Sequence, residues 1–228
     1  MWGNMTKRLI DLVLSPIIIV LSIPFIVVIL FLVIISTGQF PVIFQKRKIT
    51  LEKKSVQIIK IRTIRNRIEI PFSSFKEVER ISNNVFIKEE YEMYVPLFCR
   101  WLRKSGLDEI LQVINVLKGE MSLIGPRPLL EADLEIMQRS DEEYYNRRTK
   151  INSKPGITGM WQVYGERREG TANLIELEEF YEKEKSLLLD MKITLRTILV
   201  LLTASHSDSI LKSKEPRGIS VKLMFGIE

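Results

Sequence analysis

The first forty residues contain the longest apolar stretch of the chain. From Leu12 to Ile35 no residue is charged, and as a straight helix this stretch would be about 36 Å long, enough to cross a hydrocarbon core of roughly 30 Å. Pro24 lies in its middle, where a proline removes one backbone hydrogen bond and clashes with the carbonyl four residues earlier. The pattern therefore predicts either a kinked spanning helix or a helix that breaks near Pro24 and returns to the same face, with Ser22 bonding a freed carbonyl.

The flanks of this stretch bear on its orientation. Lys7 and Arg8 precede it and residues 46–48 follow it, all of them basic, so the positive-inside rule finds no asymmetry. The simplest account places both ends in the cytoplasm. A third interpretation is a secretory signal peptide cleaved near residues 36–38, but the apolar run exceeds the usual length of about 7–15 residues for such a region.

The remaining periodicities predict a mostly helical α+β domain. Residues 41–44 and 55–61 are short β-branched runs typical of a hairpin, whereas apolar and basic residues alternate over 97–103, which favours an interfacial helix. A helical pattern runs from Leu174 to Ala204, and its second half fits either an interfacial helix or an ordinary core helix. Residues 68–96 are expected to be a variable connection with some helix, and the tail from residue 205 to have little regular structure.

Charge and the rarity of some residue types narrow the function. The net charge is +6 and the pI about 9.3, so an anionic partner is expected. The chain carries neither a glycine-rich phosphate loop nor a nucleic-acid motif, so we expect no nucleic acid partner and favour membrane lipid. The only cysteine is Cys99 and the only histidine His206, which excludes an internal disulfide and a multi-histidine zinc site. Carboxylates are therefore the candidate catalytic groups.

Residues 105–128 contain adjacent carboxylates at the start of a helical pattern. In one interpretation Ser105 and Asp108 form a capping box, and the carboxylate only supports the helix start. In the other, the free N–H groups and partial positive charge of the helix start favour a bound phosphate and an ionised Asp108 that attacks phosphorus. Asp108 and Glu109 together could also hold Mg²⁺, which prefers oxygen ligands and commonly bridges to substrate phosphates. The motif alone leaves both interpretations open.

Two further features accompany these carboxylates. The sequence Gly125-Pro-Arg-Pro128 restricts the backbone on both sides of Arg127, so its planar guanidinium is either aimed at a phosphate or exposed on a rigid turn. Arg103 could supply a second phosphate contact. Residues 154–165 form a glycine-rich segment with aromatic residues between the glycines, which fits either a base or sugar platform or a tight connection.

With these residues in view, the chain resembles the bacterial sugar transferases, the monotopic polyprenyl-phosphate phosphoglycosyl transferases, and in particular their small members. The central motif, which ends in Gly-Pro-Arg-Pro, is highly specific. The resemblance rests on Lys7-Arg8-Leu-Ile-Asp11, Pro24, Lys60-Ile-Arg62-Thr63, residues 103–128, Lys154-Pro-Gly-Ile-Thr-Gly159 with Gln162, and residues 187–192.

The resemblance implies a reaction and a set of site residues. In such enzymes a UDP-sugar donates its phosphosugar to undecaprenyl phosphate and UMP is released, through a covalent aspartyl intermediate, as the first membrane step of glycan assembly. Asp108 would be the nucleophile, and Glu109 its partner in Mg²⁺ binding or proton handling. Asp108 and Glu109 would hold the metal. The implied phosphate- or substrate-binding residues are Arg103, Arg127, Asp190 and Gln162.

The resemblance also implies an organisation and a location. Residues 1–40 would be a re-entrant membrane anchor and residues 41–228 a catalytic domain on the cytoplasmic face of the bacterial inner membrane. A homodimer is left open, as are the sugar and the glycan pathway. Glu166 stands where relatives usually have arginine, and Glu178 where they usually have aspartate, so substrate contacts near Glu166 are in question. The competing hypothesis is a membrane-anchored, non-catalytic binding or scaffold protein.

Overall fold

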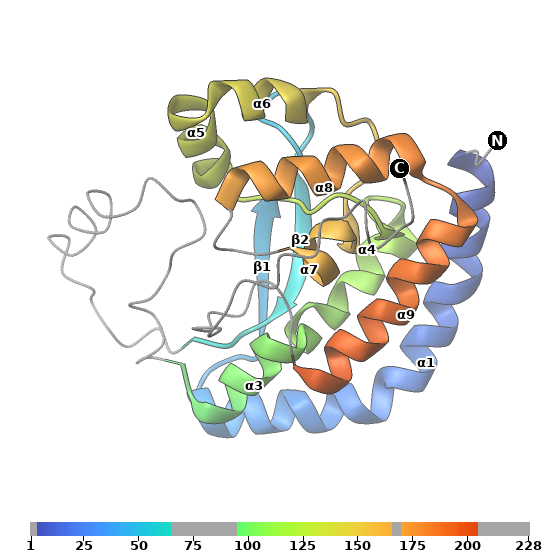
Figure 1. Cartoon of the computed structure of the whole chain (residues 1–228). Helices are drawn as coiled ribbons and strands as arrows, with labels where there is room; N and C mark the ends of the chain where they lie inside the picture. The colour runs from blue at the N-terminus through green and yellow to red at the C-terminus, as the bar shows by residue number, and fades with distance from the viewer. Residues whose placement is uncertain (1–3, 65–94, 166–169, 205–228) are drawn as a thin grey trace, which may run out of the picture.

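The structure, a computed structural model, describes residues 4–64, 95–165 and 170–204. Predictions for residues 68–94, for Glu166 and for the tail lie outside these ranges. The described part is predominantly helical, as expected (Figure 1). Its helices are α1 (Asn4–Thr37), α3 (Leu97–Ser105), the 3₁₀ helix η2 (Leu107–Gln112), α4 (Val113–Lys118), α5 (Glu131–Ser140), α6 (Glu142–Thr149), α7 (Met160–Tyr164), α8 (Gly170–Glu184) and α9 (Leu187–Thr203). Its strands are β1 (Val42–Arg47), β2 (Val56–Ile61), β3 (Ser122–Ile124) and β4 (Gly156–Thr158).

Helix α1 bends without a break. It descends beside α9 and then turns to run beneath α3 (Figure 1), yet it remains one helix through Pro16 and Pro24. A serine accompanies each proline: Ser15 Oγ donates to the Asp11 carbonyl at 2.6 Å, and Ser22 Oγ donates to the Ile19 carbonyl at 3.1 Å. These hydroxyls offer backbone carbonyls a donor in the turns that lose a proline N–H.

Both halves of α1 contact the same folded body. In the first half, the Arg8 guanidinium donates to the carbonyls of Val116 and Leu117 at the end of α4, a favourable place for a cation near a helix carboxyl terminus. In the second half, Ile29 and Val33 are buried in an apolar cluster with Ile61 of β2. Helix α1 therefore packs against the described body of the protein through both of its halves.

The predicted hairpin is confirmed. Strands β1 and β2 pair antiparallel, with Val42 opposite Ile61 and Arg47 opposite Val56. Both faces of β2 are covered: Ile61 faces the cluster beneath α1 and α3, whereas Ile58, on the alternate face, packs in a second cluster with Val116 of α4. This two-sided burial explains the nearly continuous apolar run of β2.

A second, parallel pair of strands was not foreseen. Strand β3 pairs with β4, with Ser122 opposite Gly156 and Ile124 opposite Thr158. The pairing brings two glycine-rich segments together, because a Cβ on Gly125 would meet the Lys154 carbonyl at 2.3 Å and a Cβ on Gly159 would meet the Gly125 carbonyl at 2.0 Å. The glycines are required because the two backbones approach too closely for a side chain. Residues 154–159 thus form a tight connection.

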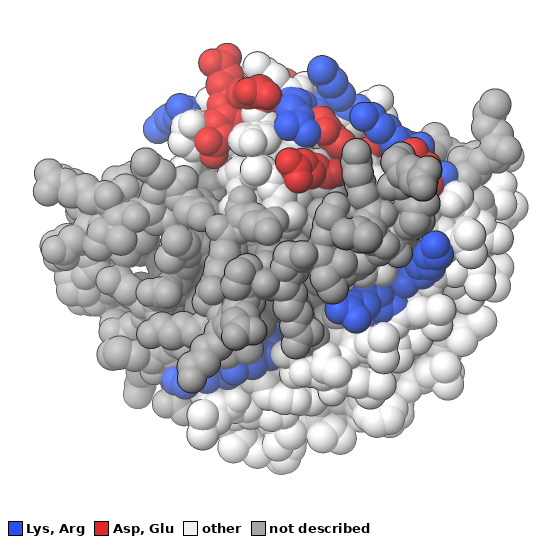
Figure 2. Space-filling model, in the orientation of Figure 1, with Lys and Arg blue, Asp and Glu red and all other residues white. Residues whose placement is uncertain are grey.

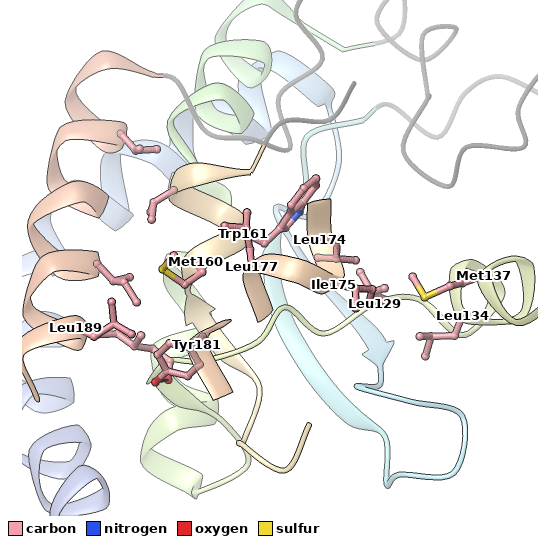
Figure 3. Packing of buried hydrophobic residues seen from close by; sticks show 14 of the residues in the cluster. Leu129, Leu134, Met137, Met160, Trp161, Leu174, Ile175, Leu177, Tyr181 and Leu189 are labelled. Atoms are coloured by element: carbon pink, nitrogen blue, oxygen red, sulfur yellow. Dashed lines mark hydrogen bonds between the residues drawn. The ribbon is translucent and has the colours of Figure 1, made fainter. Parts of the chain in front are cut away.

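The main core lies between α8, α7 and α9. Figure 3 shows Trp161 and Met160 of α7 against Leu174 and Leu177 of α8, with Leu189 of α9 beside them. Trp161 is fully buried. The single helix expected over 174–204 is instead two helices, because α8 ends at Glu184 and the Ser186 hydroxyl caps α9 by accepting the Leu189 N–H.

Among the helices that the structure describes, α1, α3 and α9 expose apolar faces. Helix α9 buries Leu189, Ile193 and Val200 on one side, and α3, the helix expected over 97–103, exposes Leu97 and Trp101. Figure 2 shows a broad surface without charged atoms along the region where α1 runs in Figure 1. Helix α1 is long and apolar enough to cross a bilayer, as judged by length and composition. The exposed apolar residues of α9 include Leu187, Leu188, Met191, Leu195, Ile198, Leu199 and Leu202.

Candidate active site

Asp108 and Glu109 lie in η2, in a sharp connection between α3 and α4. Gly106 ends α3 with a φ of 78°, a left-handed conformation that favours glycine. Both carboxylates are buried, with 3% and 6% of their surface exposed. The capping-box interpretation is wrong, because Gly106 rather than Ser105 is the N-cap of η2. The Ser105 hydroxyl donates to the Leu102 carbonyl at 3.0 Å and accepts the N–H of Leu107, at 3.4 Å, rather than that of Asp108. The expected helix is present, but its first turn is a 3₁₀ helix.

Lys60 of β2 joins the two carboxylates. Its Nζ lies 2.9 Å from Asp108 Oδ2 and 3.2 Å from Glu109 Oε1. Strand alternation places Lys60 on the same face of β2 as Ile58, which packs with Val116 of α4, and β2 also lies directly against η2. The paired charges account for the burial of two neighbouring acids, since buried carboxylates otherwise repel each other and lose hydration.

Arg127 completes this charge cluster. Its Nη2 lies 3.2 Å from Glu109 Oε1 and its Nη1 3.4 Å from Glu109 Oε2, a two-point contact. The guanidinium is thus directed at the carboxylate pair and is buried, so the exposed-turn interpretation is wrong. The four side chains of Lys60, Asp108, Glu109 and Arg127 are hereafter called the acid-base cluster.

The backbone of Arg127 is fixed from both sides by a buried ion pair. Its N–H donates to Glu178 Oε1 at 2.8 Å, and its carbonyl accepts Arg148 Nη2 at 2.5 Å. Arg148 and Glu178 also bind each other, and Arg148 Nε donates to the Ile49 carbonyl at 2.7 Å. Burial raises the pKa of the Glu178 carboxyl, an effect that the charge of Arg148 and the Arg127 N–H oppose. Glu178, which departs from the expected aspartate, therefore has a defined role in holding Arg127.

Asp190 belongs to a second buried cluster that joins α1, α8 and α9. Lys7 Nζ lies 2.7 Å from Asp190 Oδ2, and the Tyr181 hydroxyl donates to Asp190 Oδ1 at 2.9 Å. Lys7 also donates to the Tyr181 hydroxyl. Burial and the charge of Asp190 raise the pKa of the Tyr181 phenol, so it remains a neutral donor. Nearby, Asp11 Oδ1 accepts the Leu123 N–H at 3.0 Å.

Gln162 and Arg103 are placed differently from the other candidates. Gln162 lies in α7, and within the described residues neither its amide oxygen nor its amide nitrogen, both buried, has a hydrogen-bond partner. Buried amides are normally satisfied, so this one is an exception among the described residues. Arg103 lies half-buried in the last turn of α3, where its guanidinium forms no ion pair with any residue the structure places.

A largely apolar cavity connects the two clusters. Its volume is about 600 Å³, and Glu109 and Asp190 both line it, together with Lys7 and Asp11. The other candidate residues, Asp108, Arg103, Arg127 and Gln162, are not among its lining residues. The structure therefore brings Arg127 into direct contact with Glu109 and joins Asp108 to Glu109 through Lys60. The cavity links Glu109 to Asp190, and Arg103 and Gln162 lie outside these ion-pair contacts.

The carboxylates of the site could bind Mg²⁺ only together with water and substrate phosphates. Among residues 4–64, 95–165 and 170–204 there is no group of three or more carboxylate, histidine or cysteine side chains that could hold a metal. Mg²⁺ commonly binds one or two carboxylates and completes its octahedron with water and substrate phosphates. Asp108 and Glu109 fit that mode, and they do not form an all-protein metal cage.

The sequence did not predict a role for several residues of the site. Lys60 and Lys7 stood in quoted motifs without a role, although each is a charged residue at the edge of an apolar run. The Arg148–Glu178 pair has no such signal, because its members belong to polar helical segments, and only the fold buries them. The sequence pattern also gave no sign of Tyr181, whose hydroxyl donates to Asp190.

Comparison with known proteins places this arrangement in a family. Residues 2–204 match the family described as bacterial sugar transferase. The exopolysaccharide production protein ExoY of Rhizobium meliloti (strain 1021) is 30% identical over 202 residues, which cover 86% of this chain and 85% of that protein.

Two longer relatives have names that state a reaction. The UDP-galactose-lipid carrier transferase of Erwinia amylovora is 33% identical over 199 residues, and the undecaprenyl-phosphate galactose phosphotransferase of Salmonella typhimurium is 31% identical over 205 residues. In both cases the match covers 86% of this chain and 40% of the relative. The family match over residues 2–204 includes α1, the acid-base cluster and Asp190, so the chain belongs to the bacterial sugar transferase family and is an enzyme, a transferase.

Proposed function

We propose that this enzyme transfers a phosphosugar from a UDP-sugar to undecaprenyl phosphate, releasing UMP, as the first membrane step of glycan assembly. The names of relatives support both substrates: one acts on UDP-galactose and a lipid carrier, and another is a UDP-glucose:undecaprenyl-phosphate glucose-1-phosphate transferase from Klebsiella pneumoniae. The structural observation that carries the proposal is the buried Asp108–Glu109 pair held by Lys60 and Arg127.

In the first step a carboxylate oxygen of Asp108 attacks the β-phosphorus of the UDP-sugar. A bond forms between that oxygen and phosphorus, the bond from phosphorus to the bridging oxygen breaks, and UMP leaves with the electron pair. In the second step a phosphate oxygen of the lipid attacks the same phosphorus and restores the Asp108 carboxylate. Splitting the transfer lets a soluble donor and a lipid acceptor use one site in turn.

The contacts support this assignment of roles. Arg127 binds Glu109 at two points, whereas Asp108 has one cationic contact, with Lys60, among the residues that the structure describes. Asp108 is therefore the less restrained carboxylate and the better nucleophile. Lys60 and Arg127 are placed to stabilise charge on the phosphoryl oxygens, which in a buried site is worth more than in water. Arg103 and Gln162 are the proposed further donors to the UDP-sugar.

Mg²⁺ is the proposed cofactor, held by Asp108 and Glu109. When bound, it would supply neutralising charge to the diphosphate of the donor. The cationic partners of these carboxylates would then contact the substrate phosphates as well.

The membrane arrangement is part of the proposal. We infer that α1 is re-entrant and that the catalytic domain lies on the cytoplasmic face of the inner membrane. The contacts of Arg8 with α4 and of Ile29 with β2 support this, because a helix crossing the bilayer could not keep both ends on one body. The exposed apolar residues of α3 and α9 would lie in the interface.

The test is product formation by the full chain in detergent or nanodiscs. We expect UMP and polyprenyl diphosphate sugar in equal amounts, with a panel of UDP-sugars revealing the sugar. Asp108→Asn should abolish UMP release, while Asp133→Asn, on α5 outside the cluster, should retain it. Full UMP release by Asp108→Asn would refute the role of Asp108, and turnover of no UDP-sugar would refute the donor class.

A further inference from the structure

Asn115 of α4 is a buried polar residue that the proposed reaction does not yet use. Its side chain has no exposed surface. Asparagine is a weak helix former, and a buried amide must find partners for its polar atoms, so its place in this helix needs a physical reason. Helix α4 lies against β2, the strand that carries Lys60 (Figure 1), and the partners of the Asn115 amide are found on that strand.

The Asn115 amide binds the edge of β2 that faces away from β1. Its Oδ1 accepts the Ile59 N–H at 3.2 Å, and its Nδ2 donates to the Gln57 carbonyl at 2.8 Å. In an antiparallel pair the backbone groups of successive residues point alternately toward the partner strand and away from it. The Arg62 N–H donates to the Pro41 carbonyl on the β1 side, so the backbone groups of residues 57 and 59 point away from β1. The Asn115 side chain therefore binds β2 as a peptide group of a third strand would.

This contact fixes the backbone immediately before Lys60. Lys60 follows Ile59 in β2, and its Nζ lies 2.9 Å from Asp108 Oδ2 and 3.2 Å from Glu109 Oε1. Both carboxylates lie in η2, which leads directly into α4. Asn115 thus joins the helical segment that carries the two acids to the strand that carries their shared cation. A shift of β2 along α4 would move Lys60 relative to both acids.

The remaining contacts of Asn115 lie outside β2. Its Nδ2 also donates to Glu120 Oε2 at 2.6 Å, and Glu120 is exposed. Its main-chain carbonyl accepts the N–H groups of Glu120 and Met121 at 3.0 and 3.3 Å. A side-chain substitution leaves these main-chain bonds in place, so it changes only the contacts with β2 and with the Glu120 carboxylate.

We propose that Asn115 is a positioning residue of the phosphosugar transfer: it holds the edge of β2 so that Lys60 stays against Asp108 and Glu109. Asn115 touches neither the carboxylates nor the substrate, and it acts through Lys60. The inference rests on the proposed function, because the role of Lys60 belongs to it.

A double-mutant cycle with Lys60 tests this role. Asn115→Leu keeps a similar side-chain volume and removes both bonds to β2. We expect it to lower kcat by about tenfold or more in a steady-state UMP assay, because small displacements of catalytic groups are costly. In a Lys60→Ala background the same substitution should change kcat by less than about twofold, because the side chain that it positions is absent.

Glu120 supplies the matched control. Glu120→Ala removes the contact of Asn115 that lies outside β2 and leaves both bonds to the strand, so kcat should stay within about twofold of wild type. A loss of folded protein caused by Asn115→Leu would lower the rate by the same factor in both backgrounds. The coupling between the two positions therefore distinguishes positioning from a general contribution to stability.

A second measurement uses the wild-type chain and does not depend on whether a variant folds. Hydrogen exchange at residue resolution in nanodiscs should show the Ile59 amide protected to within about tenfold of the Lys60 amide, which faces β1. Exchange of the Ile59 amide at the rate of an unstructured peptide would overturn the proposal, because an amide that Asn115 binds must open before it exchanges.

The outcomes separate this inference from the proposed function. An equal fall in kcat for Asn115→Leu in the wild-type and Lys60→Ala backgrounds would make Asn115 a structural residue and leave the transfer reaction intact. Wild-type kcat in Asn115→Leu would equally overturn the inference. Absence of UMP release from wild-type enzyme with any UDP-sugar would instead refute the proposed function.

Discussion

The buried pair of Arg148 and Glu178 gives the most quantitative prediction. Arg148 is fully buried, and 1% of the Glu178 side chain is exposed. Glu178→Gln preserves the shape and an acceptor for the Arg127 N–H, but it leaves the Arg148 charge without its partner. Removing one member of a buried pair typically costs about 3–5 kcal/mol. We therefore expect Glu178→Gln to lower the free energy of unfolding by about that amount.

The adjacent residue supplies the control. Glu179 pairs with Arg147 at 2.6 Å, and the two side chains are 25% and 29% exposed, so Glu179→Gln should cost at most about 1 kcal/mol. The assay is urea unfolding in detergent, followed by tryptophan fluorescence. Because Glu178 also fixes the Arg127 backbone, turnover of the folded variant should fall too. Equal costs for the two variants, or a loss below about 1 kcal/mol for Glu178→Gln, would refute this reasoning.

Three further predictions concern single side chains. Lys60→Ala should lower kcat by about 10²-fold in a steady-state UMP assay, because it removes the cation that contacts Asp108. Gln162→Met should lower activity without lowering the unfolding midpoint, because the buried amide has no partner among the described residues. The Arg147 hydrogen bond lowers the pKa of Glu179 below its ordinary value of 4.5. The stability that Glu179 contributes is therefore present above pH 4.5 and is lost as the pH falls through the lowered pKa. The free energies of unfolding of wild type and Glu179→Gln should converge below that pKa.

Each of these predictions has an outcome that contradicts it. A wild-type kcat for Lys60→Ala would show that Lys60 does not act in the site; Lys46→Ala, at an exposed position of β1, is the control. A lower unfolding midpoint with normal activity in Gln162→Met would make Gln162 a structural residue. A stability difference between wild type and Glu179→Gln that persists or grows at low pH would contradict the sign of the Glu179 shift.

The sequence predicted the parts of the fold that depend on local patterns. The β-branched runs at residues 41–44 and 55–61 predicted the hairpin. The apolar run with Pro24 predicted a kinked or a broken helix, and α1 is one continuous helix that bends. The boundary between α8 and α9 was missed because the periodicity continues across it, although Ser186 is a good helix cap. The β3–β4 pair was missed because three-residue strands carry almost no periodic signal, and only the glycines at 125, 156 and 159 hint at close backbones.

The sequence predicted the chemistry of the candidate site better than it predicted which of its side chains contact one another. The adjacent carboxylates and the constrained Arg127 were visible in one continuous motif. Their contact with Lys60 depends on how β2 packs against η2, and the support from Arg148 comes from a helix outside the motif. Such long-range placements follow from tertiary packing, which propensity and spacing do not encode.

The central claim is that Asp108 carries the phosphosugar between donor and acceptor, and intact-protein mass spectrometry tests it most directly. Wild-type enzyme incubated with its UDP-sugar and no acceptor should gain the mass of one phosphosugar, mapped to the peptide containing Asp108 and lost when polyprenyl phosphate is added. Asp108→Asn should gain no such mass. UMP release without any protein adduct, or an adduct on another residue, would contradict the account.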